Sequence, residues 1–130
     1  MPLRPSVLIR IDSAAGLTAG VVMLSLRTFL ADMFALPPGL LLFIGLANVT
    51  YGCVSLRLAL RSDGDRVPYV RAMAGANMAW AVVCAALAVR FAGEASVVGM
   101  GQLIGEGVLV GGLGGLEWRA ASASTTPSAS

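Results

Sequence analysis

The sequence contains no histidine and no lysine, only two cysteines, and charged residues make up only 12% of it. Without histidine the chain lacks the commonest general base and the commonest metal ligand. Cys53 and Cys84 cannot by themselves form a Cys₄ or Cys₂His₂ site. Both lie within apolar runs, so we expect two small buried apolar side chains. The sequence therefore predicts no metal site, no cofactor and no enzymatic activity.

The net charge of +2 is too small to indicate nucleic-acid binding. All nine basic residues are arginines, and alanine and glycine are abundant. This composition is typical of a GC-rich coding genome, so we expect a bacterial protein.

Apolar residues make up 57% of the chain, against about 45–50% in soluble domains. They form four runs, at about residues 8–34, 39–60, 68–90 and 95–116. Each run reaches roughly the 20 residues needed to cross a hydrocarbon core of about 30 Å. A soluble bundle would carry a polar stripe on every helix, and the second and third runs have none. The sequence predicts an all-α fold, a membrane four-helix bundle over residues 1–119, followed by a disordered tail at 120–130.

A secretory signal peptide is the competing interpretation of the first run. Asp12 stands early in this run, and no A-x-A cleavage site follows its apolar core. A transmembrane segment fits these two features better.

The arginines predict the orientation of the bundle. In a four-span chain, seven arginines fall on one side of the membrane and only Arg27 and Arg90 on the other. Short cytoplasmic loops carry such an excess of arginine. We therefore expect an up-down topology with both termini in the cytoplasm, in a multi-pass protein of the bacterial inner (cytoplasmic) membrane. The turn at Pro37 and Pro38 and the loop at Gly93 and Glu94 would face outward.

Glu106 is the residue of the fourth run whose insertion into the membrane costs the most free energy. The nine leucines, isoleucines and valines of this run favour insertion by about 4 kcal/mol in sum. An acidic side chain at the centre of a span opposes insertion by about 2.5–3.5 kcal/mol. The fourth helix would insert only marginally alone, so we expect Glu106 to face the other helices.

Asn48 and Asn77 lie at a depth similar to that of Glu106, which makes them the natural hydrogen-bond partners of its carboxyl group. Tyr51, Trp80 and Thr50 are candidates to line the same polar region. Two interpretations of this cluster stay open. Glu106 is either a carboxyl group that binds a proton or a ligand, or a neutral carboxylic acid that holds the helices together.

Glycines allow close helix packing in two of the runs. Gly16 and Gly20 form a pair with small-xxx-small spacing in the first run, and the fourth run is glycine-rich throughout. We expect the glycines of the fourth run to pack within the chain, with a homodimer face as the alternative. The packing glycines of the fourth run are Gly101, Gly105, Gly107, Gly111 and Gly115.

Two further acidic residues stand near the ends of runs, each close to an arginine. Asp12 follows Arg10 in the first run, and Glu117 precedes Arg119 after the fourth. Long polar side chains reach the membrane surface from such positions. We expect both carboxyl groups to lie at the interface.

Several features resemble a broad group of small bacterial four-span membrane proteins of unknown function. These are Leu30-Ala31 before Leu36-Pro37, Gly45 followed by Tyr51, Asn77 with Trp80, and a polar residue ahead of Glu117-Trp118-Arg119. The resemblance covers most of residues 7–119 and implies the four-span fold, but no activity. The fourth run differs from the group, in which this segment is rich in alanine and valine.

The sequence is compatible with two functions. The first is a structural or accessory membrane protein whose partners are the lipid bilayer and either further copies of itself or other membrane proteins. The second is a small proton-coupled transporter organised around Glu106. An intramembrane enzyme is disfavoured, because the sequence offers no histidine, no metal cluster and no serine beside a base.

Overall fold

The computed structural model describes residues 4–61 and 66–125. Within these ranges the secondary structure is helical. Four of the helices, α1, α3, α4 and α5, are long and apolar enough to cross a membrane. The helices are α1 (Pro5–Ser25), α2 (Arg27–Phe34), α3 (Pro38–Leu60), α4 (Val67–Arg90) and α5 (Val97–Thr125).

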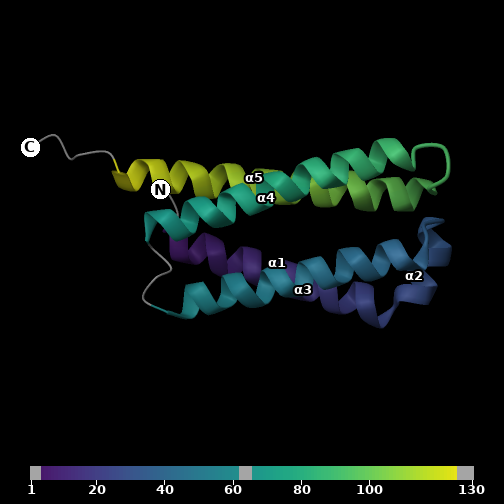
Figure 1. Ribbon diagram of the computed structural model, residues 1–130, viewed down its shortest axis with the longest axis horizontal. Coiled ribbons are helices and arrows are strands. Elements are labelled where there is room, and N and C mark those ends of the chain that lie inside the picture. Colours follow the sequence, from purple (N-terminus) through teal and green to yellow (C-terminus); the bar gives the residue numbers. More distant parts are fainter. Residues whose placement is uncertain (1–3, 62–65, 126–130) are drawn as a thin grey trace, which may run out of the picture.

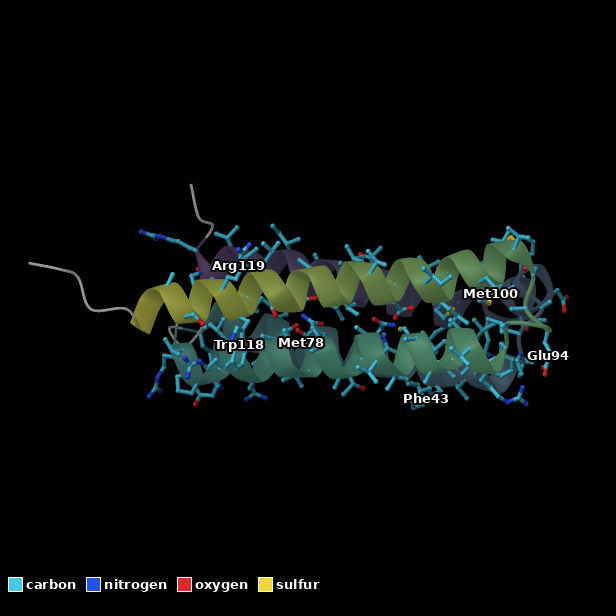
Figure 2. The ribbon with its side chains drawn as sticks, turned by 90° about the horizontal axis from the view of Figure 1, so that it is seen from above. Phe43, Met78, Glu94, Met100, Trp118 and Arg119 are labelled. Atoms are coloured by element: carbon cyan, nitrogen blue, oxygen red, sulfur yellow. The ribbon has the colours of Figure 1, made fainter. Side chains whose placement is uncertain are left out.

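The long helices form two closely packed pairs (Figure 1). Helix α1 packs along α3 and α4 packs along α5, whereas the contact between the pairs is sparser and involves mainly α1 and α5. At one end of the molecule, a cluster of buried side chains brings together all four long helices: Ile9, Ala59, Val70 and Ala121. Glu94 lies at the opposite end from Trp118 and Arg119 (Figure 2).

The α4–α5 connection is fastened to the end of α2. The backbone N–H of Ser96 donates to the carbonyl oxygen of Phe34 at 2.9 Å. The hydroxyl of Ser96 donates to the carbonyl oxygen of Met33 at 2.8 Å. These bonds hold the two helix pairs together at the end that is remote from the α1 N-terminus.

Prolines begin three of the long helices, in the first turn, where the missing N–H group costs nothing. Helix α2 ends at Ala35, whose φ of 53° places it in the left-handed region. The N–H of Leu36 then donates back to the carbonyl oxygen of Ala31 at 3.1 Å, as in a Schellman motif. Pro37 follows, and α3 starts at Pro38, within the turn predicted from the sequence.

The first predicted span, 8–34, is divided in the structure. Leu26 (φ −108°, ψ 21°) separates α1 from α2, although its N–H still donates to Val22. The bend turns Leu30 and Phe34 of α2 into a core cluster with Ile44 of α3. Apolar composition alone did not predict this bend, because its cause is tertiary packing.

Helix α5 continues to Thr125, so the predicted boundary at 116 was too early and residues 120–125 are helical, not disordered. Alanine is the best helix former, and Ala121 is fully buried among side chains of the other three long helices. Residues 126–130 of the predicted tail lie outside the described residues.

Small residues set the close approach of α1 to α3. A Cβ atom at Gly20 would lie only 2.8 Å from the backbone nitrogen of Val49 and 2.9 Å from the carbonyl oxygen of Gly45. A Cβ atom at Gly52 would lie 2.9 Å from the backbone nitrogen of Leu17. The small-xxx-small pair of the first run is therefore a contact face within the chain.

We expect Gly20→Ala to lower the free energy of unfolding by about 1–3 kcal/mol, because the new methyl group meets backbone atoms that cannot turn aside. Gly112→Ala is the matched control, since nothing lies within 4 Å of the new Cβ there. The control should be neutral, or stabilising by up to about 1 kcal/mol. Unfolding in mixed detergent micelles measures both variants, and equal stability of the two would contradict this packing.

The outer surface of the bundle is apolar. Large apolar side chains are exposed along every long helix, among them Phe43, Val82 and Val108, and Val89 is 79% exposed. Several polar side chains are buried at the same time. Such extensive apolar exposure marks a surface that contacts lipid or protein.

Candidate functional site

A cavity of about 390 Å³ lies between the two helix pairs. Most of its wall is made of small or apolar side chains, and all four long helices contribute. Four of the lining residues are exposed, Ala19 of α1 and Gly101, Gly105 and Leu109 of α5, so the cavity reaches the surface of the bundle. The polar side chains on its wall are Asp12, Asn48, Tyr51, Asn77, Trp80, Gln102 and Glu106.

Glu106 accepts hydrogen bonds from three helices. Its Oε1 atom accepts from Asn48 Nδ2 on α3 and from Trp80 Nε1 on α4, both at 2.7 Å. Its Oε2 atom accepts from Gln102 Nε2, one turn earlier on α5, at 3.1 Å. The partners are all neutral donors, and among the described residues no arginine pairs with this carboxyl group. We call Glu106 with these three donors the Glu106 cluster.

The Trp80 ring also packs against another aromatic ring, that of Phe43. Its centroid lies 5.7 Å from that of Phe43, with the two rings tilted by 46°. The indole N–H is directed at Glu106, and the ring also lines the cavity. Trp80 thus brings an aromatic surface to the cavity beside the carboxyl group.

A second polar cluster borders the same cavity, because Asp12, Tyr51 and Asn77 also line its wall. Asn77 Nδ2 donates to Asp12 Oδ2 at 2.7 Å and to Glu117 Oε2 at 3.1 Å. The hydroxyl of Tyr51 donates to the same Asp12 oxygen. Asp12 is 2% exposed and Glu117 is fully buried. We call Asp12, Tyr51, Asn77 and Glu117 the Asp12–Glu117 cluster.

The structure therefore distributes the three predicted polar residues over two clusters. Asn48 lies with Glu106 and donates a hydrogen bond to its carboxyl group. Asn77 lies with Asp12 and Glu117 instead, because Gly114 packs against the Cβ of Asn77 and sets the register of α4 on α5.

Only two of the three predicted lining residues are part of the cavity wall. Tyr51 and Trp80 line the cavity. Thr50 is exposed on α3 and is not part of the cavity wall, which contradicts the expectation for this residue. It stands next to Tyr51 in the sequence, and consecutive residues of a helix point in directions about 100° apart.

Some of the predicted packing glycines of α5 contact α4, and the others face open space. Gly107 and Gly111 pack against α4, where a Cβ would meet Cys84 at 3.1 Å and Ala81 at 3.4 Å. Gly101, Gly105 and Gly115 have nothing within 4 Å of a Cβ position. Only part of the predicted glycine series thus packs within the chain.

Three site residues were missed from the sequence: Asp12, Gln102 and Glu117. Asp12 and Glu117 were expected at the interface, but both are buried. Helical spacing held a clue, because Asp12 stands four residues before Gly16, and Glu117 stands eleven residues, or about three turns, after Glu106. Each therefore shares a face with a residue that the sequence had placed inside the bundle.

The described residues contain no group of three or more His, Cys, Asp or Glu side chains that could hold a metal ion. Cys84 is buried as expected, but Cys53 is exposed. Its position on the apolar outer surface of α3 contradicts the expectation that both thiols are buried.

Comparison of the chain with family models, with curated proteins and with solved structures found no match. The functional argument therefore depends on the two polar clusters and the cavity.

Proposed function

We propose that the chain is a multi-pass integral protein of a bacterial cytoplasmic membrane and that it is a small proton-coupled carrier of organic cations. The membrane assignment is supported by four helices that are long and apolar enough to cross a bilayer. The exposed apolar side chains along these helices suit contact with lipid.

The proposed orientation is up-down, with both termini in the cytoplasm. Seven arginines fall on the side that would face the cytoplasm, and Arg27 and Arg90 on the other. The position of Glu94 at the end opposite Trp118 and Arg119 supports this division (Figure 2).

A single observation carries the proposed cargo: the carboxyl group of Glu106 lies on the wall of a cavity that is otherwise largely apolar. A volume of about 390 Å³ falls within the range of small-molecule sites, roughly 300–1,000 Å³. A ligand that complements this wall has an apolar body and one positive charge. The nearby rings of Trp80 and Tyr51 suit such a charge as well.

Glu106 would bind the cation directly. A carboxylate has about four lone-pair sites, and three hydrogen bonds use part of this capacity. A quaternary or protonated amine can therefore approach while the three donors keep the carboxyl group oriented.

A structural or accessory role is the second candidate, and the same cluster favours it. The donors to Glu106 come from α3, α4 and α5, so the carboxyl group also ties these helices together. In this case Glu106 would specify the fold, and the partners would be other membrane proteins or further copies of the chain.

Counterflow in proteoliposomes tests the carrier. Vesicles loaded with unlabelled benzyltrimethylammonium should transiently accumulate the radiolabelled cation from outside, because a carrier exchanges ligand across the membrane. Protein-free vesicles and vesicles with Glu94→Gln, a change at an exposed residue, are the controls. Accumulation no greater than in protein-free vesicles would refute the carrier and favour the accessory role.

A further inference from the structure

The Asp12–Glu117 cluster contains two buried carboxyl groups that share one hydrogen-bond donor. The same amide nitrogen, Asn77 Nδ2, donates to an oxygen of each group. The two oxygen atoms that share this nitrogen therefore lie near each other. Ionised carboxylates only accept hydrogen bonds, so two of them cannot bond to each other, whereas a proton on one would allow such a bond.

In the part of the chain that the structure describes, neither carboxyl group of this pair forms a salt bridge. The groups that face Glu117 are Asp12 from α1, Tyr51 from α3 and Asn77 from α4. Among the described residues no arginine pairs with either carboxyl group. Two negative charges about 4 Å apart repel by about 4 kcal/mol even at an effective dielectric constant of 20, and one proton removes this repulsion.

One oxygen of the pair has no partner. Glu117 Oε1 is buried and receives no hydrogen bond, while Glu117 Oε2 accepts from Asn77. A buried acceptor without a donor is costly. A proton on Glu117 would lower this cost, because a neutral carboxyl group is less costly to bury than a carboxylate.

One carboxyl group of the pair borders the cavity. Asp12, Tyr51 and Asn77 line the same cavity as Glu106. Asp12 is therefore the member of the pair that borders the cavity, whereas Glu117 is not part of its wall. An organic cation in this cavity would favour the doubly ionised pair by simple attraction.

We propose that Asp12 and Glu117 form a proton-binding site, separate from Glu106, which releases its proton when an organic cation occupies the cavity. The site holds one proton on the carboxyl pair in the empty protein. Cation entry breaks one O–H bond and the proton leaves to water, so the total charge within the bundle is unchanged. By linkage, protonation of the pair weakens cation binding by the same factor. The coupling rests on the proposed carrier function, but the proton site does not.

The first experiment uses the ligand-free protein in lipid nanodiscs and infrared difference spectroscopy between acid and alkaline buffer. Wild type and Glu106→Gln should both show the C=O band of a protonated carboxyl group, lost at alkaline pH. Glu117→Gln and Asp12→Asn should each lack the band. If one of these two variants does not fold, the other provides the test. A band that persists in both variants, or that disappears only in Glu106→Gln, would overturn the proposed site.

The second experiment measures proton release with a pH dye when benzyltrimethylammonium is added. Wild type and Glu94→Gln should release about one proton per bound cation, and Glu117→Gln none while it still binds the cation. Release that persists in Glu117→Gln would overturn the coupling and leave the carrier intact. If wild type binds no cation but keeps the infrared band, the carrier fails and the proton site stands. A site that is occupied by Na⁺ and never by a proton would show no band at any pH, and this result would also overturn the proposal.

Discussion

Glu106→Gln should weaken the binding of benzyltrimethylammonium at least about tenfold, or by ~1.4 kcal/mol, while the helical content stays that of wild type. The substitution keeps the shape of the side chain but replaces the carboxyl group of Glu106 with an amide that cannot carry a negative charge. It also places an NH₂ group opposite Gln102, or opposite Asn48 and Trp80, all of which are donors. Donor against donor leaves buried polar atoms unpaired.

The fluorescence of Trp80 reports this binding, because its ring lines the cavity. Trp118, the other tryptophan, is 44% exposed near the far end of α5, and Trp118→Phe removes its background. Glu94→Gln makes the same chemical change at an exposed position and should bind as wild type does. An unchanged affinity in Glu106→Gln would exclude Glu106 as the group that binds the cation.

Asn77→Leu should lower the free energy of unfolding by about 3 kcal/mol. Leucine is similar in volume, so the loss comes from the two hydrogen bonds that Asn77 donates to Asp12 and Glu117. Without them, Glu117 keeps no hydrogen bond from a neutral donor, and Asp12 keeps only that of Tyr51. Unfolding in mixed detergent micelles gives the value.

The control for this loss is Thr50→Val, which removes a hydroxyl group from an exposed position of α3 and should change stability by about 0.5 kcal/mol or less. A double-mutant cycle with Glu117→Gln isolates the contact. The cost of Asn77→Leu should shrink when residue 117 is already neutral. Equal costs in both backgrounds would show that Asn77 does not stabilise the carboxyl pair.

The sequence predicts the long helices well because membrane crossing is a matter of length and composition. Among the described residues the structure has only helices, and four of them are long and apolar enough to cross a membrane. The proximity of Glu106 and Asn48 also follows from the sequence, because both stand near the middle of uncharged runs and neither can face lipid cheaply.

The Asp12–Glu117 cluster could not be predicted in the same way. A predicted end of the fourth span at 116 placed Glu117 at the surface, whereas α5 continues to Thr125 and leaves it about two turns inside the helix. The extension depends on burial of Ala121 against the other helices, which is a tertiary effect. Similarly, Asp12 beside Arg10 looks interfacial until the packing of Gly16 and Gly20 on α3 turns that face of α1 inward.

The bend at Leu26 has the same kind of cause. Its residue type and its neighbours contain no helix breaker, and the burial of Leu30 and Phe34 accounts for the change of direction. Contacts between distant segments, rather than local preference, thus decide which polar side chains meet in the interior.

The most direct test of the central claim, that the cavity binds an organic cation at a carboxyl group, compares two ligands of equal shape. Benzyltrimethylammonium and its uncharged carbon isostere, neopentylbenzene, are titrated into wild-type protein and their affinities are measured by Trp80 fluorescence. The account predicts that the cation binds at least about ten times more tightly than the isostere. Equal affinities, or tighter binding of the uncharged compound, would contradict it.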